Sequence, residues 1–340
     1  MLESHNQPLP RILTGARPTG PLHIGHYFGY LKTCLNLELE SEMFLMIADV
    51  QALTDNWDET NKVSTAVNDV ALDILAMLAK PEETVVFLQS QIPQIAELTV
   101  FFSNLVTVNR LQRNPTVKTE ISQKQDKFGQ DGESITYGFL GYPVSQTADV
   151  AVIRANCIPV GIDQVPILEQ AKEILERFDR TYNSQIFPNP KPKLSSTPKI
   201  LGLDGNSKMS KSIGNTIFLK ATDEETLTKI KSAKTDSLTQ IGYEPDNRPE
   251  ISNLVQLYSF VTDMTIEEVL TDLKDIRYGD FKVKLGQEIN NYFRPFRQRR
   301  IELENNPHKV KQLLEQGKNK TLIEAEITMK LVRHAIGIDY

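Results

Sequence analysis

The chain has 340 residues, of which 40% are hydrophobic and 24% charged, and its formal net charge is −6. This length predicts about two domains. The acidic balance excludes a uniformly basic surface, so any contact with nucleic acid must be local. No apolar run approaches the roughly 18 residues of a membrane span, and the N-terminus lacks the basic and apolar parts of a signal peptide. We therefore expect a cytoplasmic protein with no membrane partner.

Two cysteines, Cys34 and Cys157, lie in apolar surroundings and show no metal-binding spacing. We expect free, buried thiols rather than a disulfide, as suits a reducing cytosol.

Short apolar segments that alternate with helical patterns predict the first domain. Strands are predicted at 11–16, 43–49, 84–90 and 157–161, and helices at about 25–37 and 62–79. Strands that are apolar throughout are typical of a parallel sheet covered on both faces. The pattern therefore predicts a doubly wound α/β domain.

The last two predicted strands are joined by a long connection, residues 92–156. Its first part is apolar, and its polar part, "KTEISQKQDKFGQDGES", is expected to be a mobile surface segment. From about residue 223 helical patterns follow one another with no strand between them. We therefore expect a catalytic domain over 1–220 and a helical domain over 221–340.

The segment "RPTGPLHIGHYFGYLK", residues 17–32, joins the first predicted strand to a helix. In an open α/β sheet, ligands bind at the carboxyl ends of the strands, where helix amino ends favour phosphate. His23 and His26 flank the helix start and can donate to phosphate oxygens, while Gly25 leaves room for a planar base. A surface turn with two chance histidines is the alternative.

A second motif, "GNSKMSKSIGNTI" at 205–217, carries Lys208 and Lys211 among serines and glycines. A flexible loop of this composition can bring two ammonium groups onto a polyphosphate. Alone, such a loop is usually a solvated surface. Together with the histidine turn it favours a phosphate site.

"HIGH" at 23–26 and "KMSKS" at 208–212 resemble the two motifs of class I aminoacyl-tRNA synthetases. "GARPTGPLHIGHYFG", "IADVQALTD", "GYPVSQTADV", "IPVGIDQVPILEQAKEI", "SAKTDS" and "ISNLVQLYSF" follow, in order, the pattern of bacterial tryptophanyl-tRNA synthetases. The resemblance runs from Ile12 to about Ala335. It implies a Rossmann-type catalytic domain, a helical anticodon-binding domain, a homodimer, and ATP, L-tryptophan and tRNA(Trp) as partners.

The resemblance also implies the site residues. The ATP site would consist of Arg17, Thr19, Gly20, His23, Gly25, His26, Lys118, Gly161, Asp163, Gln164, Lys208, Met209, Ser210 and Lys211. Among these, the catalytic groups would be His23, His26, Lys208 and Lys211. The amino-acid pocket would consist of Leu13, Gln146, Asp149, Ile158 and Val160. Mg²⁺ is expected on the phosphates, held mainly by ATP rather than by protein ligands.

One residue of the predicted amino-acid pocket matches the tryptophanyl family pattern and another departs from it. Asp149 matches the aspartate that accepts a hydrogen bond from the indole N–H; the alternative is a carboxylate exposed on a helix face. Gln146 stands where most tryptophanyl enzymes have methionine, and Gln-x-x-Asp resembles the phenol-binding pair of tyrosyl-tRNA synthetases. Arg17 replaces a common glutamine and Gln51 a common histidine. A tryptophanyl subgroup with these substitutions is the preferred interpretation, because the "DQWGNI" continuation typical of tyrosyl enzymes is missing.

Two different functions are also compatible with parts of this pattern. A small-molecule nucleotidyltransferase shares the histidine turn but usually lacks the lysine loop and the helical tail. A synthetase-like regulatory paralogue would tend to lose ATP-site residues, whereas both motifs are complete here.

The segment "FRPFRQRR" at 293–300 mixes four arginines with two aromatic residues. It could contact RNA phosphates and stack on unpaired bases. Equally, its two phenylalanines could pack inside the helical domain.

Overall fold

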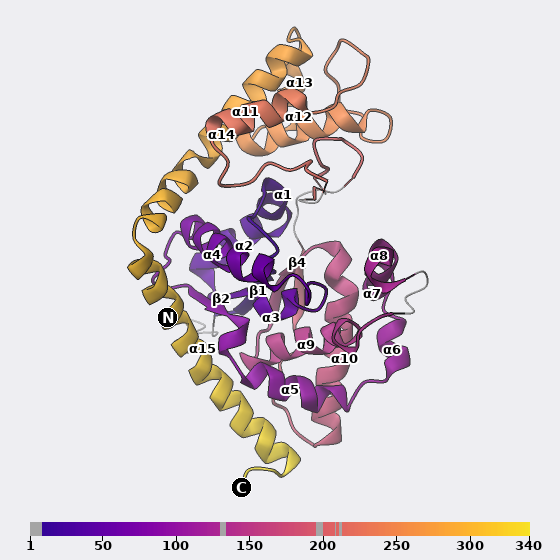
Figure 1. Cartoon of the computed structure of the whole chain (residues 1–340), viewed down its shortest axis with the longest axis vertical. Helices are drawn as coiled ribbons and strands as arrows, with labels where there is room; N and C mark the ends of the chain where they lie inside the picture. Colours follow the sequence, from indigo (N-terminus) through magenta and orange to yellow (C-terminus); the bar gives the residue numbers. More distant parts are fainter. Residues whose placement is uncertain (1–8, 130–133, 195–199, 208, 211–212) are drawn as a thin grey trace, which may run out of the picture.

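The computed structural model describes residues 9–129, 134–194, 200–207, 209–210 and 213–340. Figure 1 shows a sheet with helices around it, a group of helices at one end, and a long C-terminal helix along one side. No helix in the described part of the chain is long and apolar enough to cross a membrane.

A parallel five-stranded sheet forms the centre of the larger part, in the order β3-β2-β1-β4-β5. The strands are β1 (Arg11–Ala16), β2 (Glu42–Ile47), β3 (Val85–Leu88), β4 (Cys157–Val160) and β5 (Lys191–Leu194). The predicted parallel α/β sheet is therefore confirmed, with β2 and β3 ending earlier than expected. β5 escaped prediction because its sequence, KPKL, is polar and contains proline, as suits an exposed edge strand.

Helices cover both faces of the sheet. Successive side chains of β1 point to opposite faces and pack against different helices. Ile12 packs in one apolar cluster with α4, whereas Leu13 packs in another with α5, α9 and α10. The helices that follow the strands are α1 (Ile24–His26), a π-helical turn (Tyr27–Leu31), α2 (Lys32–Leu37), α3 (Asp49–Ala52), α4 (Thr60–Met77), α5 (Gln94–Ser103) and α10 (Val165–Thr181). The predicted helices at 25–37 and 62–79 are present, the first with the π-helical turn inside it.

The connection between β3 and β4 is helical. After α5 it contains α6 (Val108–Gln112), α7 (Pro115–Gln123), α8 (Gln125–Phe128) and α9 (Tyr137–Val152). The polar part, expected to be a mobile surface segment, therefore has regular structure over most of its described length. Asn114 caps α7 by accepting from the Thr116 amide, and Pro115 starts the helix. The buried Val117 and Phe128 anchor it against Phe139 of α9.

The described C-terminal residues are helical, as predicted. They form α11 (Asp223–Ser232), α12 (Pro249–Thr262), α13 (Ile266–Asp272), α14 (Tyr278–Glu304) and α15 (Pro307–Ile336). α15 runs back along the sheet and packs against β3, with Ala325 and Met329 buried in the α5–α9 cluster (Figure 1). It thereby covers the β3 edge, which would otherwise expose unpaired backbone groups.

Gly317 makes the close approach of α15 to β3 possible. A Cβ at this position would lie 1.9 Å from the Val86 carbonyl oxygen, so Gly317→Ala forces α15 away from the strand. We expect a loss of about 1 to 3 kcal/mol in the free energy of unfolding, measured in urea. Gly279→Ala in α14, where nothing lies within 4 Å, is the matched control and should change stability by less than about 1 kcal/mol. Equal effects would show that the contact is not tight.

The arginine run at 293–300 divides between the interior and the surface, with Arg294 and Arg299 exposed. Phe293 and Phe296 are buried, and Arg297 donates to Asp223 and to Asn290. Arg300 is 4% exposed and pairs with Asp73 of α4. The packing of the two phenylalanines is therefore confirmed, and two of the arginines are engaged inside the molecule while the other two face solvent.

Both cysteines are free, as predicted. Cys34 is buried, and burial raises the pKa of its thiol to about 12. Cys157 is only partly buried, which departs from the prediction, because it lies at the first position of β4.

Candidate active site

The histidine turn follows the carboxyl end of β1 and leads directly into α1. His23 is buried and His26 is partly exposed, and their ring centroids are 3.7 Å apart. His26 Nδ1 accepts a hydrogen bond from the backbone N–H of His23 at 3.2 Å. The turn is therefore held by its own side chains at the sheet edge where α/β proteins bind ligands.

The end of the lysine motif, Ile217, and the two residues after it bind the histidine turn through their backbone. The amide of Ile24 donates to the Ile217 carbonyl at 3.0 Å, and the amide of Leu219 donates to the Leu22 carbonyl at 2.9 Å. His23 and Phe218 form an antiparallel bridge between them. The two motifs, far apart in sequence, thus share one small backbone unit.

Met209 of the lysine loop packs directly on the turn. A Cβ added to Gly25 would lie 3.2 Å from Met209 Sδ and 2.9 Å from His23 Nδ1. Met209 is buried, whereas Ser210 is partly exposed. The predicted Lys208 and Lys211 lie outside the described residues.

Asn215 holds the base of the lysine loop, a role that the sequence did not reveal. Its Oδ1 accepts from the Ser210 amide at 2.8 Å, and its Nδ2 donates to Asp204 at 3.0 Å and to Ser207 at 3.2 Å. A Cβ at Gly202 would collide with the Asn215 amide nitrogen, at 1.9 Å. The only sequence signal is a turn-forming "DGNS" at 204–207, which predicts a turn without its partner.

The second part of the predicted ATP site follows β4, the neighbour of β1. Gly161 leads into a short turn, Ile162–Gln164, where a Cβ on the glycine would meet Asp163 Oδ1 at 2.6 Å. Gln164 Nε2 donates to Asp163 Oδ2 at 3.2 Å, and Asp163 is exposed. The chain order reverses between β1 and β4, so this is the switch point of the sheet.

Helix α7 borders the same switch point. Thr116 Oγ1 donates to the backbone carbonyl of Asp163 at 2.8 Å, and Lys118 lies exposed two residues further along α7. The structure thus brings the polar connection to the Gly161–Gln164 turn.

The turn directly after β1 is tied to the connection by charge. Arg17 pairs with Asp55, and Asp55 also pairs with Lys124 at the end of α7. Thr19 donates its amide to the Arg17 carbonyl, and Gly20 adopts a φ of +132°, which favours glycine. Sequence reasoning selected the three turn residues but missed Asp55 and Lys124, which are distant in sequence.

Asp149 is a buried carboxylate on α9, which excludes the alternative of an exposed helix face. It is 3% exposed, and Gln89 Nε2 donates to its Oδ1 at 2.8 Å. Burial raises the pKa of this carboxyl to about 7, although the hydrogen bond from Gln89 lowers it. Gln89 directly follows β3, and its Oε1 accepts from the Gln51 amide at 2.8 Å. Asp149 is therefore anchored to the carboxyl edge of the sheet.

The remaining pocket candidates share an apolar cluster or a helix face with the neighbours of Asp149. Leu13 and Ile158 belong to the apolar cluster that contains the neighbours of Asp149 on α9, and Val160 packs against that cluster. Gln146 is half-buried and three residues before Asp149, hence on the same helix face.

Two buried polar atoms belong to residues connected with Asp149, Tyr142 through helix α9 and Gln51 through Gln89. The hydroxyl of Tyr142, one turn of α9 before Gln146, is buried and has no hydrogen-bond partner among the described residues. The side-chain oxygen Oε1 of Gln51 is in the same situation. Buried polar atoms of this kind commonly form a hydrogen bond with a bound ligand or an ordered water molecule.

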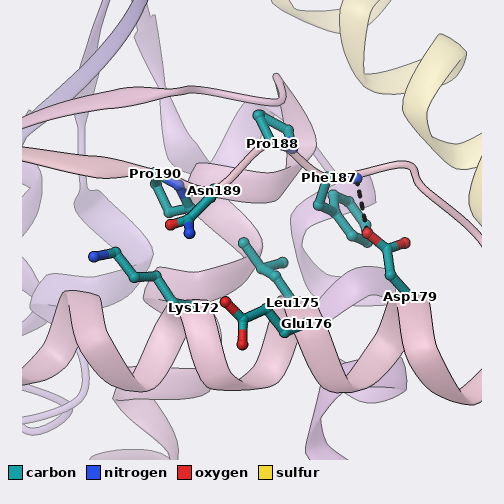
Figure 2. Close-up of a pocket in the computed structure, with 8 residues that line it drawn as sticks. All are labelled: Lys172, Leu175, Glu176, Asp179, Phe187, Pro188, Asn189 and Pro190. Carbon is teal, nitrogen blue, oxygen red and sulfur yellow. Dashed lines mark hydrogen bonds between the residues drawn. The ribbon is translucent and has the colours of Figure 1, made fainter.

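Two cavities lie elsewhere. Figure 2 shows one between α10 and residues 187–190, with a volume of about 40 Å³. A larger one of about 410 Å³ lies between α4 and the corner of α14 and α15. Neither is lined by any described residue of the two motifs. In the described ranges, no group of three or more histidine, cysteine, aspartate or glutamate side chains is arranged to hold a metal ion.

Comparisons with known proteins agree with this geometry. The family described as tRNA synthetases class I (W and Y) matches residues 5–294. The tryptophan–tRNA ligase of Streptococcus mutans is 41% identical over 345 residues, which cover 97% of this chain and 99% of that protein. The Lactococcus lactis tryptophan–tRNA ligase is 42% identical over 343 residues, 97% of this chain and 98% of that protein.

Solved structures show the same likeness. The tryptophanyl-tRNA synthetase of Mycoplasma pneumoniae superposes with a TM-score of 0.82 at 23% identity, over 97% of this chain and 98% of that one. The Campylobacter jejuni enzyme complexed with ADP and tryptophan gives 0.81 at 27% identity, over 96% of this chain and 99% of that one. The chain therefore belongs to the class I tRNA synthetases of the tryptophan and tyrosine group, and within it to the tryptophan–tRNA ligase family.

Proposed function

We propose that the chain activates L-tryptophan with ATP and transfers the resulting tryptophanyl group to tRNA(Trp). The observation that carries this proposal is the backbone unit between the histidine turn and the end of the lysine motif, Ile24 N to Ile217 O at 3.0 Å. It joins the two nucleotide-binding motifs at the carboxyl end of β1. Membership of the tryptophan–tRNA ligase family supports the same assignment.

Activation is a displacement at phosphorus. The tryptophan carboxylate attacks the α-phosphate of ATP, the bond to the β-phosphate oxygen breaks, and pyrophosphate leaves. No covalent bond to the enzyme is required, so the protein contributes positioning and charge stabilisation. We assign donors to the phosphates to His23 and His26, and the neutralisation of the leaving pyrophosphate to Lys208 and Lys211. Mg²⁺ on the phosphates would neutralise further charge and would be held mainly by ATP.

The adenosine half of ATP is assigned to the switch point of the sheet. Asp163 is exposed beside Gly161 and can accept from ribose hydroxyls, while Gln164 and Gly161 border the same turn. Gly25, against which His23 and Met209 pack, is assigned to the same site. Thr19, Gly20, Lys118, Met209 and Ser210 complete the proposed ATP site.

We assign the indole of tryptophan to the pocket around Asp149. An indole N–H can only donate, and a buried carboxylate can only accept once it is ionised. Gln89 occupies Oδ1 of Asp149, which leaves Oδ2 for the substrate. Leu13, Ile158 and Val160 would pack against the ring, and Gln146 would occupy the place of the usual methionine.

Tyrosine is the second candidate substrate. Gln146 and Asp149 lie on the same face of α9, and an amide beside a carboxylate suits a phenol, which both donates and accepts. The relatives at 40–42% identity, all tryptophan–tRNA ligases, favour tryptophan.

The remaining partners follow from the same assignment. We propose a cytoplasmic homodimer whose helical part, residues 221–340, reads the anticodon. Arg297 and Arg300 are excluded from that contact because they bind Asp223 and Asp73 inside the molecule.

Aminoacylation of unmodified transcripts tests the transfer step. The purified chain should charge a tRNA(Trp) transcript with radiolabelled tryptophan in an ATP-dependent reaction. A tRNA(Tyr) transcript with labelled tyrosine is the matched control and should remain uncharged. Charging of the tyrosine pair alone would transfer the assignment to the second candidate, and charging of neither would favour the regulatory paralogue.

A further inference from the structure

A buried ion pair lies directly behind the histidine turn. Asp73 of α4 is fully buried, and its Oδ2 accepts a hydrogen bond from the Leu22 amide at 2.9 Å. Its other oxygen, Oδ1, accepts from Arg300 Nε at 2.7 Å. One carboxylate thus connects α14 of the helical part to the residue that precedes His23.

The partner segment of the histidine turn is held from the same side. Arg297 Nε donates to the Leu219 carbonyl at 3.2 Å, and Lys220 pairs with Asp69 at 2.8 Å. Asp69 also receives Arg300 Nη2 at 2.7 Å. Both strands of the backbone unit that joins the two motifs are therefore attached to one cluster of charges on α4 and α14.

Stability alone is a weak reason for such a cluster. Removing two charges from water costs free energy that their attraction often only balances, and well-packed apolar residues commonly replace buried pairs without loss. Burial also raises the pKa of Asp73 to about 6, against the opposing effect of Arg300. What apolar side chains cannot provide is an oxygen for the buried amide of Leu22.

We propose that Asp73 and Arg300 are positioning residues for adenylate formation. Asp73 fixes the backbone of Leu22, and through it the histidine turn, while Arg300 fixes Asp73 and connects it to α14. A shift of this turn would move His23 and His26 relative to the phosphates. The inference rests on the proposed function, since it assigns these residues to the same ATP site.

Two double variants isolate the acceptor for Leu22. Asp73→Asn with Arg300→Gln keeps an oxygen for the amide of Leu22, and Asn Nδ2 can donate to the new glutamine. Asp73→Leu with Arg300→Gln removes the oxygen and differs at position 73 alone. In single-turnover adenylate formation, the leucine variant should be slower by about 10- to 100-fold, and the asparagine variant by less than about threefold. Tryptophan affinity, from equilibrium dialysis, should stay the same in both.

Controls separate this inference from the proposed function and from misfolding. The unmodified chain must first form adenylate with tryptophan; if it does not, the proposed function fails independently of this pair. Arg333→Gln with Glu97→Gln removes an ion pair between α15 and α5 and should leave the rate unchanged.

If the leucine variant does not fold, Arg300→Leu is compared with Arg300→Gln, which retains a donor for Asp73 and should be the faster of the two. Equal rates within the compared pair, or a parallel loss of tryptophan affinity and rate, would overturn the inference.

Discussion

Asp149→Ala is expected to raise the KM for tryptophan in ATP–pyrophosphate exchange by about 10- to 100-fold, with little change in the KM for ATP. A hydrogen bond to a charged group is worth about 1.5 to 3 kcal/mol, and its removal leaves the indole N–H unpaired in an apolar pocket. The proposed ATP site lies on other elements, mainly the turns after β1 and β4 and the lysine loop, so the KM for ATP should not respond to the change.

A neighbour on the same helix provides the control for Asp149. Thr147 is buried on α9, and its hydroxyl donates to the Pro143 carbonyl at 2.8 Å. Thr147→Ala should lower stability slightly and leave the KM for tryptophan unchanged. An equal rise in KM for both substrates in Asp149→Ala would assign a structural role to the carboxylate.

The raised pKa of Asp149, about 7, also predicts how stability depends on pH. Between the unfolded value near 4 and the folded value, the folded chain binds more protons at this site than the unfolded chain does. Stability therefore falls as pH rises through this window, and the destabilisation is fully present above pH of about 7. The asparagine of Asp149→Asn does not ionise, so this variant lacks the destabilisation. The difference in free energy of unfolding between the variant and the unmodified chain should therefore be more favourable to the variant at pH 8 than at pH 5. Urea unfolding at both pH values measures this difference.

Lys211→Ala is expected to slow adenylate formation by about 10² to 10³-fold, with little effect on tryptophan affinity. A donor aimed at developing charge contributes to the transition state more than to substrate binding, so the loss falls on the rate. Rapid-quench measurement with saturating tryptophan resolves this step.

An exposed lysine away from the motifs is the comparison for Lys211. Lys191 lies exposed on β5, at the far edge of the sheet, so Lys191→Ala removes the same charge at a distance. Its rate should equal that of the unmodified chain. Should both variants be equally fast, the lysine loop does not act on the phosphates.

Much of the sheet was predictable because buried parallel strands are apolar along their whole length. β5 was not, since Lys191 and Pro192 place it outside that pattern although it pairs with β4. The return of α15 was also hidden. Helical periodicity shows that one face of α15 is buried but does not identify what buries it. In the structure, Gly317 lies against Val86 of β3, and Met329 lies in the α5–α9 cluster.

The candidate site also has residues that the sequence predicted and residues that it did not. Motif residues such as His23 and Met209 were recognisable because their spacing is local, and the structure brings their segments together through Ile24 and Ile217. Gln89 and Asn215 were missed because a single polar residue carries no sign of the partners that it meets only in the folded chain. The arginines after Phe293 show the same limit, because charge in the sequence does not tell that Arg300 is buried against Asp73 while Arg294 and Arg299 stay exposed.

ATP–pyrophosphate exchange with each of the twenty amino acids in turn tests whether the two joined motifs activate tryptophan. We expect exchange that depends on tryptophan and is much weaker with tyrosine. Exchange driven by tyrosine above tryptophan, or none with any amino acid, would contradict this assignment.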